Sequence, residues 1–153
     1  MDAMDIKILD CLKKNAREKA SDISKEIHLA VSTVIERIRK MESAGLIKAY
    51  TIILDEKKMG NDLTVLMEVS LQHPNDYESF IEMIEGNPNI VSCYYMTGDF
   101  DFILKIICRS SDELEYLHKT IKGHDGVSAT RTHYVLKNVK NSYCTVPTVG
   151  EGR

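Results

Sequence analysis

The side chains best suited to chemistry lie close together in residues 32–40. Hydroxyl, acidic and basic residues recur there at helical spacing: Ser32, Thr33, Glu36, Arg37, Arg39 and Lys40. Arginine and lysine contact DNA phosphates and guanine, small hydroxyl residues allow close approach to a groove, and glutamate accepts a hydrogen bond from cytosine. Because most surface helices also carry a solvated polar face, the interpretation depends on the elements that position these residues.

No other pattern in the sequence predicts catalysis. The five histidines are not paired at metal-ligand spacing, and the four cysteines form no C-x-x-C pair. The G-x-S-x-G, P-loop and G-x-G-x-x-G motifs are absent. We therefore expect no enzyme, no metal and no cofactor, and we expect reduced thiols in a cytoplasmic protein.

Composition and charge distribution indicate a folded chain with two different halves. Hydrophobic residues make up 43% and charged residues 28%, as in ordinary globular proteins. No apolar run approaches the roughly 20 residues that cross a bilayer, and no apolar segment resembles a signal peptide, so no membrane contact is expected. Residues 1–50 hold 10 basic and 8 acidic residues (net +2), whereas the remainder holds 10 and 15 (net −5). This asymmetry suggests separate roles for the two halves.

Three short helices are predicted in residues 1–50. Apolar residues recur at helical spacing in three stretches: Ile6, Leu9 and Leu12; Ala20, Ile23 and Ile27; Val34, Ile38 and Met41. Ser21-Asp22 is the expected N-cap of the second helix, and Gly45 ends the third. A connection at about Leu29–Val31 is short enough for a helix-turn-helix. With Val34, Ile38 and Met41 turned inward, Ser32, Glu36 and Arg39 point outward, flanked by Thr33, Ile35 and Lys40, and Arg37 lies at the edge of the buried stripe. This arrangement favours DNA binding.

The next residues connect this domain to a second one. Residues 46–54 are rich in β-formers and predict a short wing or an outgoing strand, on which Lys48 is a candidate phosphate contact. We place a linker at 51–61.

An α+β domain is predicted over 62–140, followed by a C-terminal tail at 141–153. Strand patterns at 63–71, 90–97, 100–107 and 127–139 alternate with helical patterns at 77–84 and 114–121. The middle strands flank Gly98-Asp99, a two-residue hairpin signal. The order βαββαβ is ferredoxin-like, with both helices on one face of the sheet. We expect the other face to expose Val65 or Val69 and Tyr134 or Leu136, and hence to require a partner such as a second copy.

The ordered motifs resemble those of the Lrp/AsnC family, the leucine-responsive or feast/famine regulators. The matching segments are DIKIL at 5–9, VIERIRKME at 34–42, GLI at 45–47, TGDFDF at 97–102, GV at 126–127 and TRT at 130–132. The chain departs from the family at Ala30, where a serine usually opens the recognition helix. An Ala in place of such a cap costs roughly 0.5–2 kcal/mol, and Ser32 or Thr33 is the expected substitute.

The resemblance implies a transcription regulator that binds double-stranded DNA, forms homodimers and assembles further, often to octamers. It also implies an amino-acid effector near the Gly98 turn, between dimers. The residues that match this region are Thr97, Gly98, Asp99, Phe100, Asp101, Thr130 and Thr132. Backbone N–H groups of the turn would hold the effector carboxylate, and Asp99 or Asp101 would pair with its ammonium group.

Two other functions remain open at this point. The ferredoxin-like fold also hosts enzymes, and the sirohaem decarboxylases resemble this architecture. A sensor or assembly module without DNA binding is the other possibility, because Glu36 and Glu42 reduce the positive charge of the third helix.

Overall fold

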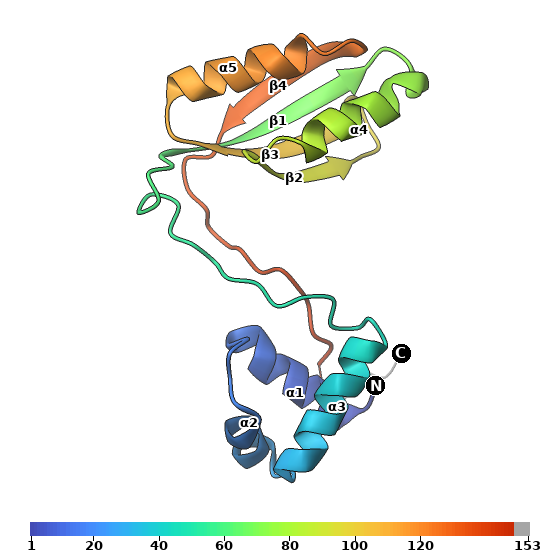
Figure 1. The fold of residues 1–153 in the computed structure, drawn as a ribbon, viewed down its shortest axis with the longest axis vertical. Coiled ribbons are helices and arrows are strands. Elements are labelled where there is room, and N and C mark those ends of the chain that lie inside the picture. The colour runs from blue at the N-terminus through green and yellow to red at the C-terminus, as the bar shows by residue number, and fades with distance from the viewer. Residues whose placement is uncertain (149–153) are drawn as a thin grey trace. The chain divides into compact units, whose positions relative to one another are not determined.

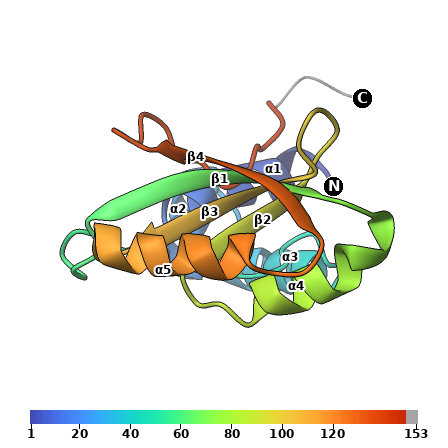
Figure 2. The ribbon, with the colours of Figure 1, turned by 90° about the horizontal axis from the view of Figure 1, so that it is seen from above.

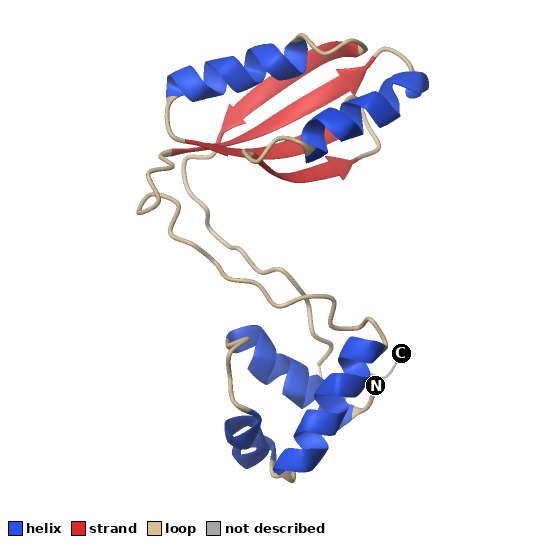
Figure 3. Cartoon of the chain, in the orientation of Figure 1, coloured by secondary structure: helices blue, strands red, loops and turns tan. Residues whose placement is uncertain are grey.

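The computed structural model describes residues 1–148, which fold into two compact units (Figure 1). The first unit comprises residues 1–53 together with the segment from Lys140 onward, and the second comprises Leu54–Val139. Two segments without helix or strand connect the units (Figure 3). One precedes the second unit in the sequence and the other follows it. Among the described residues, no helix is sufficiently long and apolar to span a bilayer.

The first unit is the predicted bundle of three helices. They are α1 (Ala3–Lys14), α2 (Ala20–Ile27) and α3 (Val31–Ser43). Each helix contributes two side chains to one buried core: Ile8 and Cys11, Ile23 and Ile27, and Val34 and Met41. The apolar periodicity predicted the core positions of α2 and α3, because a helix must bury its apolar stripe against its neighbours. In α1 the prediction was wrong by one position: Ile8 and Cys11 are buried, whereas Leu9 and Leu12 are only partly buried at the edge of the core.

The ends of these helices differ from the expected caps. The residue before α2 is Lys19 and the residue before α3 is Ala30, and neither makes a side-chain cap hydrogen bond. The expected caps at Ser21-Asp22, and at Ser32 or Thr33, are therefore wrong. The connection from α2 to α3 occupies residues 28–30, and His28 takes the left-handed conformation with φ 57°. The C-terminal end of α3 is as predicted, since Gly45 adopts φ 69° directly after it.

The predicted wing is absent. Residues 46–54 contain no strand, and Ile52 and Ile53 have exposed fractions of 74% and 68%. A β-strand requires a neighbouring strand for its backbone N–H and C=O groups, and no described segment of this chain pairs with residues 46–54. The high β-propensity of these residues therefore predicted the wrong element.

The second unit has the predicted ferredoxin-like order. Its elements are β1 (Leu63–Leu71), the 3-10 turn η1 (Pro74–Asp76), α4 (Tyr77–Glu85), β2 (Ile90–Tyr95), β3 (Phe102–Cys108), α5 (Ser111–Lys122) and β4 (Val127–Tyr134). The four strands form an antiparallel sheet in the order β2-β3-β1-β4. Both helices cover the same face of this sheet (Figure 2). The core between them includes Met67, Phe80, Leu104 and Leu117.

The strand register corrects our assignment of the open face. Val65 and Val69 are fully buried in the helix-covered core, so they do not lie on the open face as expected. Tyr134 pairs with Val65 and shares its face. The open face instead carries Leu66 and Glu68 from β1, which alternate with the buried row.

Two strand ends were also predicted incorrectly. β4 ends at Tyr134 and does not extend to Val139. In the hairpin, Tyr95 pairs with Phe102, and the strands stop there. Residues 96–101 form the connection, which is longer than the expected two-residue turn. A backbone hydrogen bond of 2.7 Å from Met96 N–H to the Asp101 carbonyl closes it.

Candidate functional site

The outward face of α3 is a compact polar surface. Ser32, Glu36, Arg39 and Lys40 are exposed, whereas Val34 on the opposite side is fully buried. Within the described residues, the side chains of these four polar residues make no hydrogen bond or ion pair. Thr33 is half-buried at the edge of this face. The charged groups are therefore free to contact an external partner.

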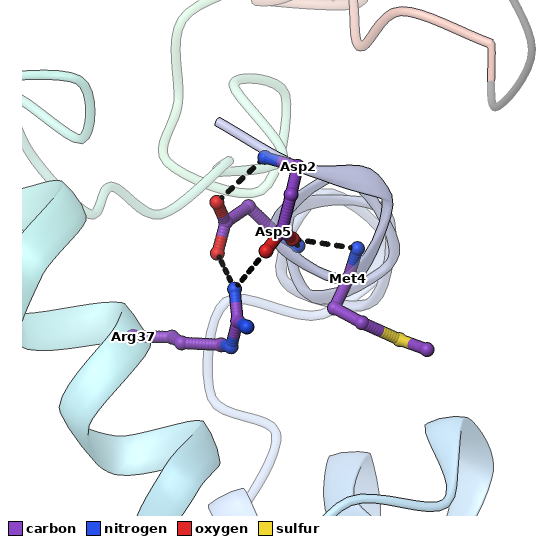
Figure 4. A network of polar contacts seen from close by, with 4 residues as sticks. All are labelled: Asp2, Met4, Asp5 and Arg37. Atoms are coloured by element: carbon purple, nitrogen blue, oxygen red, sulfur yellow. Dashed lines mark hydrogen bonds and ion pairs between the residues drawn. The ribbon is translucent and has the colours of Figure 1, made fainter.

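Arg37 has a different environment from its neighbours on α3. Its Nη1 atom lies 2.7 Å from Asp2 Oδ2 and 2.7 Å from Asp5 Oδ1 (Figure 4). Asp2 is the N-cap of α1, where it accepts backbone hydrogen bonds from Met4 and Asp5, and Asp5 in turn accepts from the Asp2 amide. This reciprocal arrangement is a capping box whose two carboxylates both bind Arg37. Arg37 therefore joins α3 to the start of α1, in addition to its predicted role at DNA.

The charges of this cluster stabilise one another. Hydrogen bonds from the Asp5 amide and from Arg37 hold the pKa of Asp2 below its usual value of 3.8. Burial raises the pKa of Asp5, but the Asp2 amide and Arg37 outweigh burial, and its pKa is also lowered. The hydrogen bonds to Asp5 and Asp2 raise the pKa of Arg37. The sequence contained a signal for this cluster, because aspartates at positions 2 and 5 have the spacing of a capping box.

The segment after α3 places Lys48 and Tyr50 at the surface. Lys48 is exposed and its side chain makes no hydrogen bond or ion pair within residues 1–148, so it is free to contact a phosphate. The Tyr50 hydroxyl donates a hydrogen bond of 2.8 Å to Glu42 on α3. Partial burial and this carboxylate raise the pKa of Tyr50 to about 12. The phenol is therefore a neutral donor that links the end of α3 to the outgoing segment.

In the second unit, the turn around Gly98 is anchored to β1. Asp101 donates its backbone N–H to the Val69 carbonyl at 3.0 Å, and its carboxylate accepts from the Leu71 amide at 2.8 Å. The Ser70 hydroxyl donates to the Asp99 carbonyl at 3.3 Å. Thr97, Gly98 and Asp99 themselves are exposed at the tip. One carboxylate oxygen of Asp101 thus has a structural role, whereas the Asp99 carboxylate has no partner in residues 1–148.

The predicted effector residues gather at one end of the sheet but on two faces. Thr130 pairs with Val69 and Thr132 with Met67, so both threonines lie on the helix-covered face. Phe100 packs under the Arg131 guanidinium, with 4.8 Å from the Cζ atom to the ring centre. Since Arg131 follows Thr130 in a strand, its side chain lies on the opposite, open face.

The two threonines differ in their hydrogen bonding. The Thr130 hydroxyl lies 3.2 Å from His118 Nε2 on α5. The Thr132 hydroxyl oxygen is buried and has no hydrogen-bond partner. A buried hydroxyl without a hydrogen bond lowers the stability of the fold. Among the predicted effector residues, Thr132 therefore has the clearest capacity to bond an additional partner. Among the described residues, no cluster of three or more His, Cys, Asp or Glu side chains forms a metal site.

Comparison with known families matches both units. The AsnC-type helix-turn-helix domain matches residues 1–42, and the Lrp/AsnC ligand binding domain matches residues 64–144. The second match alone covers more than half of the chain.

Individual proteins give the same result. The leucine-responsive regulatory protein of Haemophilus influenzae is 34% identical over 147 residues, covering 93% of this chain and 87% of its own length. The solved structure of Escherichia coli AsnC has a TM-score of 0.85 and 30% identity, and the match covers 94% of this chain and 97% of that one. A transcriptional regulator from Neisseria meningitidis, solved as a complex with L-Met, has a TM-score of 0.90 and 26% identity, covering 98% of this chain and 97% of its own.

Proposed function

This chain belongs to the Lrp/AsnC family of transcriptional regulators, and on that basis we propose that α3 reads specific duplex DNA sequences under the control of an amino-acid effector. The chain is a regulator with a helix-turn-helix domain and a ligand-binding domain. Our proposal adds that the chain binds specific DNA sequences, that its effector is an amino acid bound at the Gly98 turn, and that the protein is located in the cytoplasm.

The exposed face of α3 is the observation that carries the DNA proposal. Arg39 and Lys40 have no partner within the described residues, and they lie beside exposed Ser32 and Glu36. An arginine and a lysine without internal partners can neutralise phosphates or donate to guanine without losing a bond within the protein. Arg37, by contrast, would have to give up or share its bonds to Asp2 and Asp5.

A homodimer would present two copies of α3 to one side of the duplex. Half-sites would then lie about one helical turn (~34–36 Å) apart, or a multiple of it. The open sheet face supports self-association, since Leu66 and Ile103 are only partly buried there and Tyr94 is 62% exposed. Larger assemblies such as an octamer are part of the same proposal.

An amino acid bound at the Gly98 turn would bias one assembly state. Two features support this site: the exposed backbone of the turn and the buried Thr132 hydroxyl without a partner. The L-Met complex of the related Neisseria regulator makes an amino-acid effector a reasonable class here. If the assembly states hold the helix-turn-helix domains differently, the effector changes DNA affinity through linkage.

Genomic footprinting with the purified protein, repeated with each of the common amino acids, tests this function. We expect protected sites with paired half-sites, and at least one amino acid that changes their occupancy. The same preparation should show salt-sensitive binding in a gel shift against random competitor DNA. If no duplex is preferred over the competitor, the regulator would be an assembly or sensor module that does not read sequence.

A further inference from the structure

Two apolar side chains on α3 are exposed. The helix contains five apolar residues, and three of them, Val34, Ile38 and Met41, belong to the buried core or pack against it. Val31 and Ile35 have exposed fractions of 42% and 38%. Since residues four apart are neighbours on the surface of a helix, these two form one continuous apolar strip, which we call the Ile35 strip.

The stability of α3 does not explain the Ile35 strip. Branching at Cβ restricts the χ1 angle against the preceding turn, so valine and isoleucine form helices less well than alanine, lysine or glutamate. An exposed position also gains less from packing than a core position does. The same restriction favours binding, because a side chain with few rotamers loses little conformational entropy when a partner covers it.

The strip borders the polar face of α3. At about 100° per residue, Ile35 lies about 40° from Arg39 and about 60° from Ser32 around the helix axis. Ser32, Glu36 and Arg39 are exposed, and their side chains make no hydrogen bond or ion pair within the described part of the chain. A partner that contacts this polar face therefore also covers Ile35.

The order of residues along α3 indicates which part of the DNA the strip meets. Arg39 and Lys40 lie in the second half of the helix, whereas the first two turns present Ser32, Ile35 and Glu36. The Glu36 carboxylate repels a phosphate, and a phosphate offers no apolar surface to Ile35. In helix-turn-helix proteins, the N-terminal residues of the recognition helix contact base edges in the major groove. The first half of α3 is therefore suited to base edges.

Among the four standard bases, the apolar group exposed in the major groove is the 5-methyl group of thymine. We propose that Ile35, extended by Val31 at the start of α3, selects a thymine in each half-site by packing against this methyl group. A cytosine at the same position would leave the strip in contact with water, so an A·T pair is preferred there. The inference rests on the proposed DNA-binding function and adds a base that α3 recognises.

Replacing thymine by uracil tests this contact, because the two bases differ only by the 5-methyl group. A duplex that the full chain protects in footprinting is prepared with uracil at one thymine at a time, and gel shifts compare the affinities. We expect one thymine in each half-site at which uracil weakens wild-type binding about fourfold, the effect of exposing one methyl-sized group. The Ile35→Ala variant should bind the thymine and uracil duplexes equally. Ile35→Val, which keeps a branched apolar side chain, should retain part of the preference.

Matched variants separate methyl recognition from general effects. Lys40→Ala removes a charge from the same helix and should weaken binding of both duplexes equally, so that their ratio stays about fourfold. Leu46→Ala removes an apolar side chain that is 51% exposed outside α3, and it should leave the ratio unchanged. Circular dichroism of Ile35→Ala should show the helix content of the wild type, because alanine is the stronger helix former.

Specific DNA binding that no uracil substitution weakens would overturn the selection of thymine and leave the regulator function standing. A uracil effect of the same size in Ile35→Ala would also overturn it, because the methyl group would then contact another residue. If Ile35→Ala changes the elution volume in size-exclusion chromatography and leaves the thymine-to-uracil ratio unchanged, the strip is a contact between copies of the chain. A protein that prefers no duplex over random competitor would remove the DNA-binding function and this inference together.

Discussion

Arg37 Nη1 on α3 lies 2.7 Å from Asp5 Oδ1 on α1, so the helix predicted to read DNA is bound to the first helix by a charged hydrogen bond. Asp2 binds the same nitrogen at 2.7 Å. The side chains of Arg37 and Asp5 have exposed fractions of 30% and 15%, which limits competition from water. The position of α3 therefore depends on two carboxylates at the N-terminus of the chain.

The first prediction concerns Arg37→Met, which keeps much of the side-chain length but removes the charge. It should lower the thermal midpoint of unfolding, because two neighbouring carboxylates lose their shared cation. DNA affinity should fall mainly through the loosened position of α3. Calorimetry and a gel shift on the same preparation would measure both effects. Reduced DNA binding at an unchanged midpoint would instead make Arg37 a direct DNA contact.

The same cluster predicts how stability depends on pH. The pKa values of Asp2 and Asp5 are lowered in the folded chain, so their contribution is fully present above the unfolded value of 3.8. It should be lost as the pH falls below 3.8 through the folded pKa values. Urea unfolding at pH 7 and at steps below pH 4 should show a steeper acid loss in the wild type than in Arg37→Met. Parallel pH profiles would show that Arg37 does not shift these pKa values.

Arg39 provides the direct test of the reading face. If Arg39 contacts a base, Arg39→Ala should weaken specific DNA binding by about 1–3 kcal/mol. If Arg39 contacts a phosphate, the substitution should reduce the slope of the logarithm of the binding constant against the logarithm of the salt concentration by about 1. The oligomer seen by size-exclusion chromatography should not change. Arg17→Ala is the matched control, because Arg17 is exposed in the same unit but lies between α1 and α2. Equal losses in the two variants would indicate a general charge effect.

Thr130 and Thr132 form a natural pair for comparison. Thr130→Val should cost about 0.5–1.5 kcal/mol of unfolding free energy, because it removes the hydrogen bond with His118. Thr132→Val should leave stability unchanged or raise it by up to about 1 kcal/mol, because its buried hydroxyl has no partner. If this hydroxyl serves the effector, Thr132→Val should also reduce the effector response. Denaturant unfolding and a gel shift with effector would test the two statements separately.

The backbone conformation of Gly98 leads to a prediction about the stability of the turn. Its φ of 129° is rarely adopted by other residues, although no neighbouring atom would contact an added Cβ. Gly98→Ala should therefore cost about 1–3 kcal/mol through backbone strain alone. Gly86→Ala is the control, since Gly86 has an ordinary φ of −74° after α4. A similar stability for both variants would show that the turn relaxes readily.

The sequence by itself determined the local elements and the family. Periodicity of 3.6 and 2 identified the three N-terminal helices and the βαββαβ order, because each helix or strand must bury one row of apolar side chains. The ordered motifs from DIKIL to TRT indicated the family, which the comparisons confirmed. Gly45 also indicated the end of α3 correctly, since its signal is local.

Only the tertiary structure decided which groups meet. Arg37 and Asp5 are 32 residues apart in the sequence, and their contact depends on how α1 packs against α3. Alternation in β1 predicted two rows of residues, but the pairing of strands and the position of the helices decided that Val65 and Val69 lie in the core. Residues 46–54 have the composition of a strand, but no strand within residues 1–148 pairs with them. Long-range contacts of this kind depend on chain packing, which no local pattern contains.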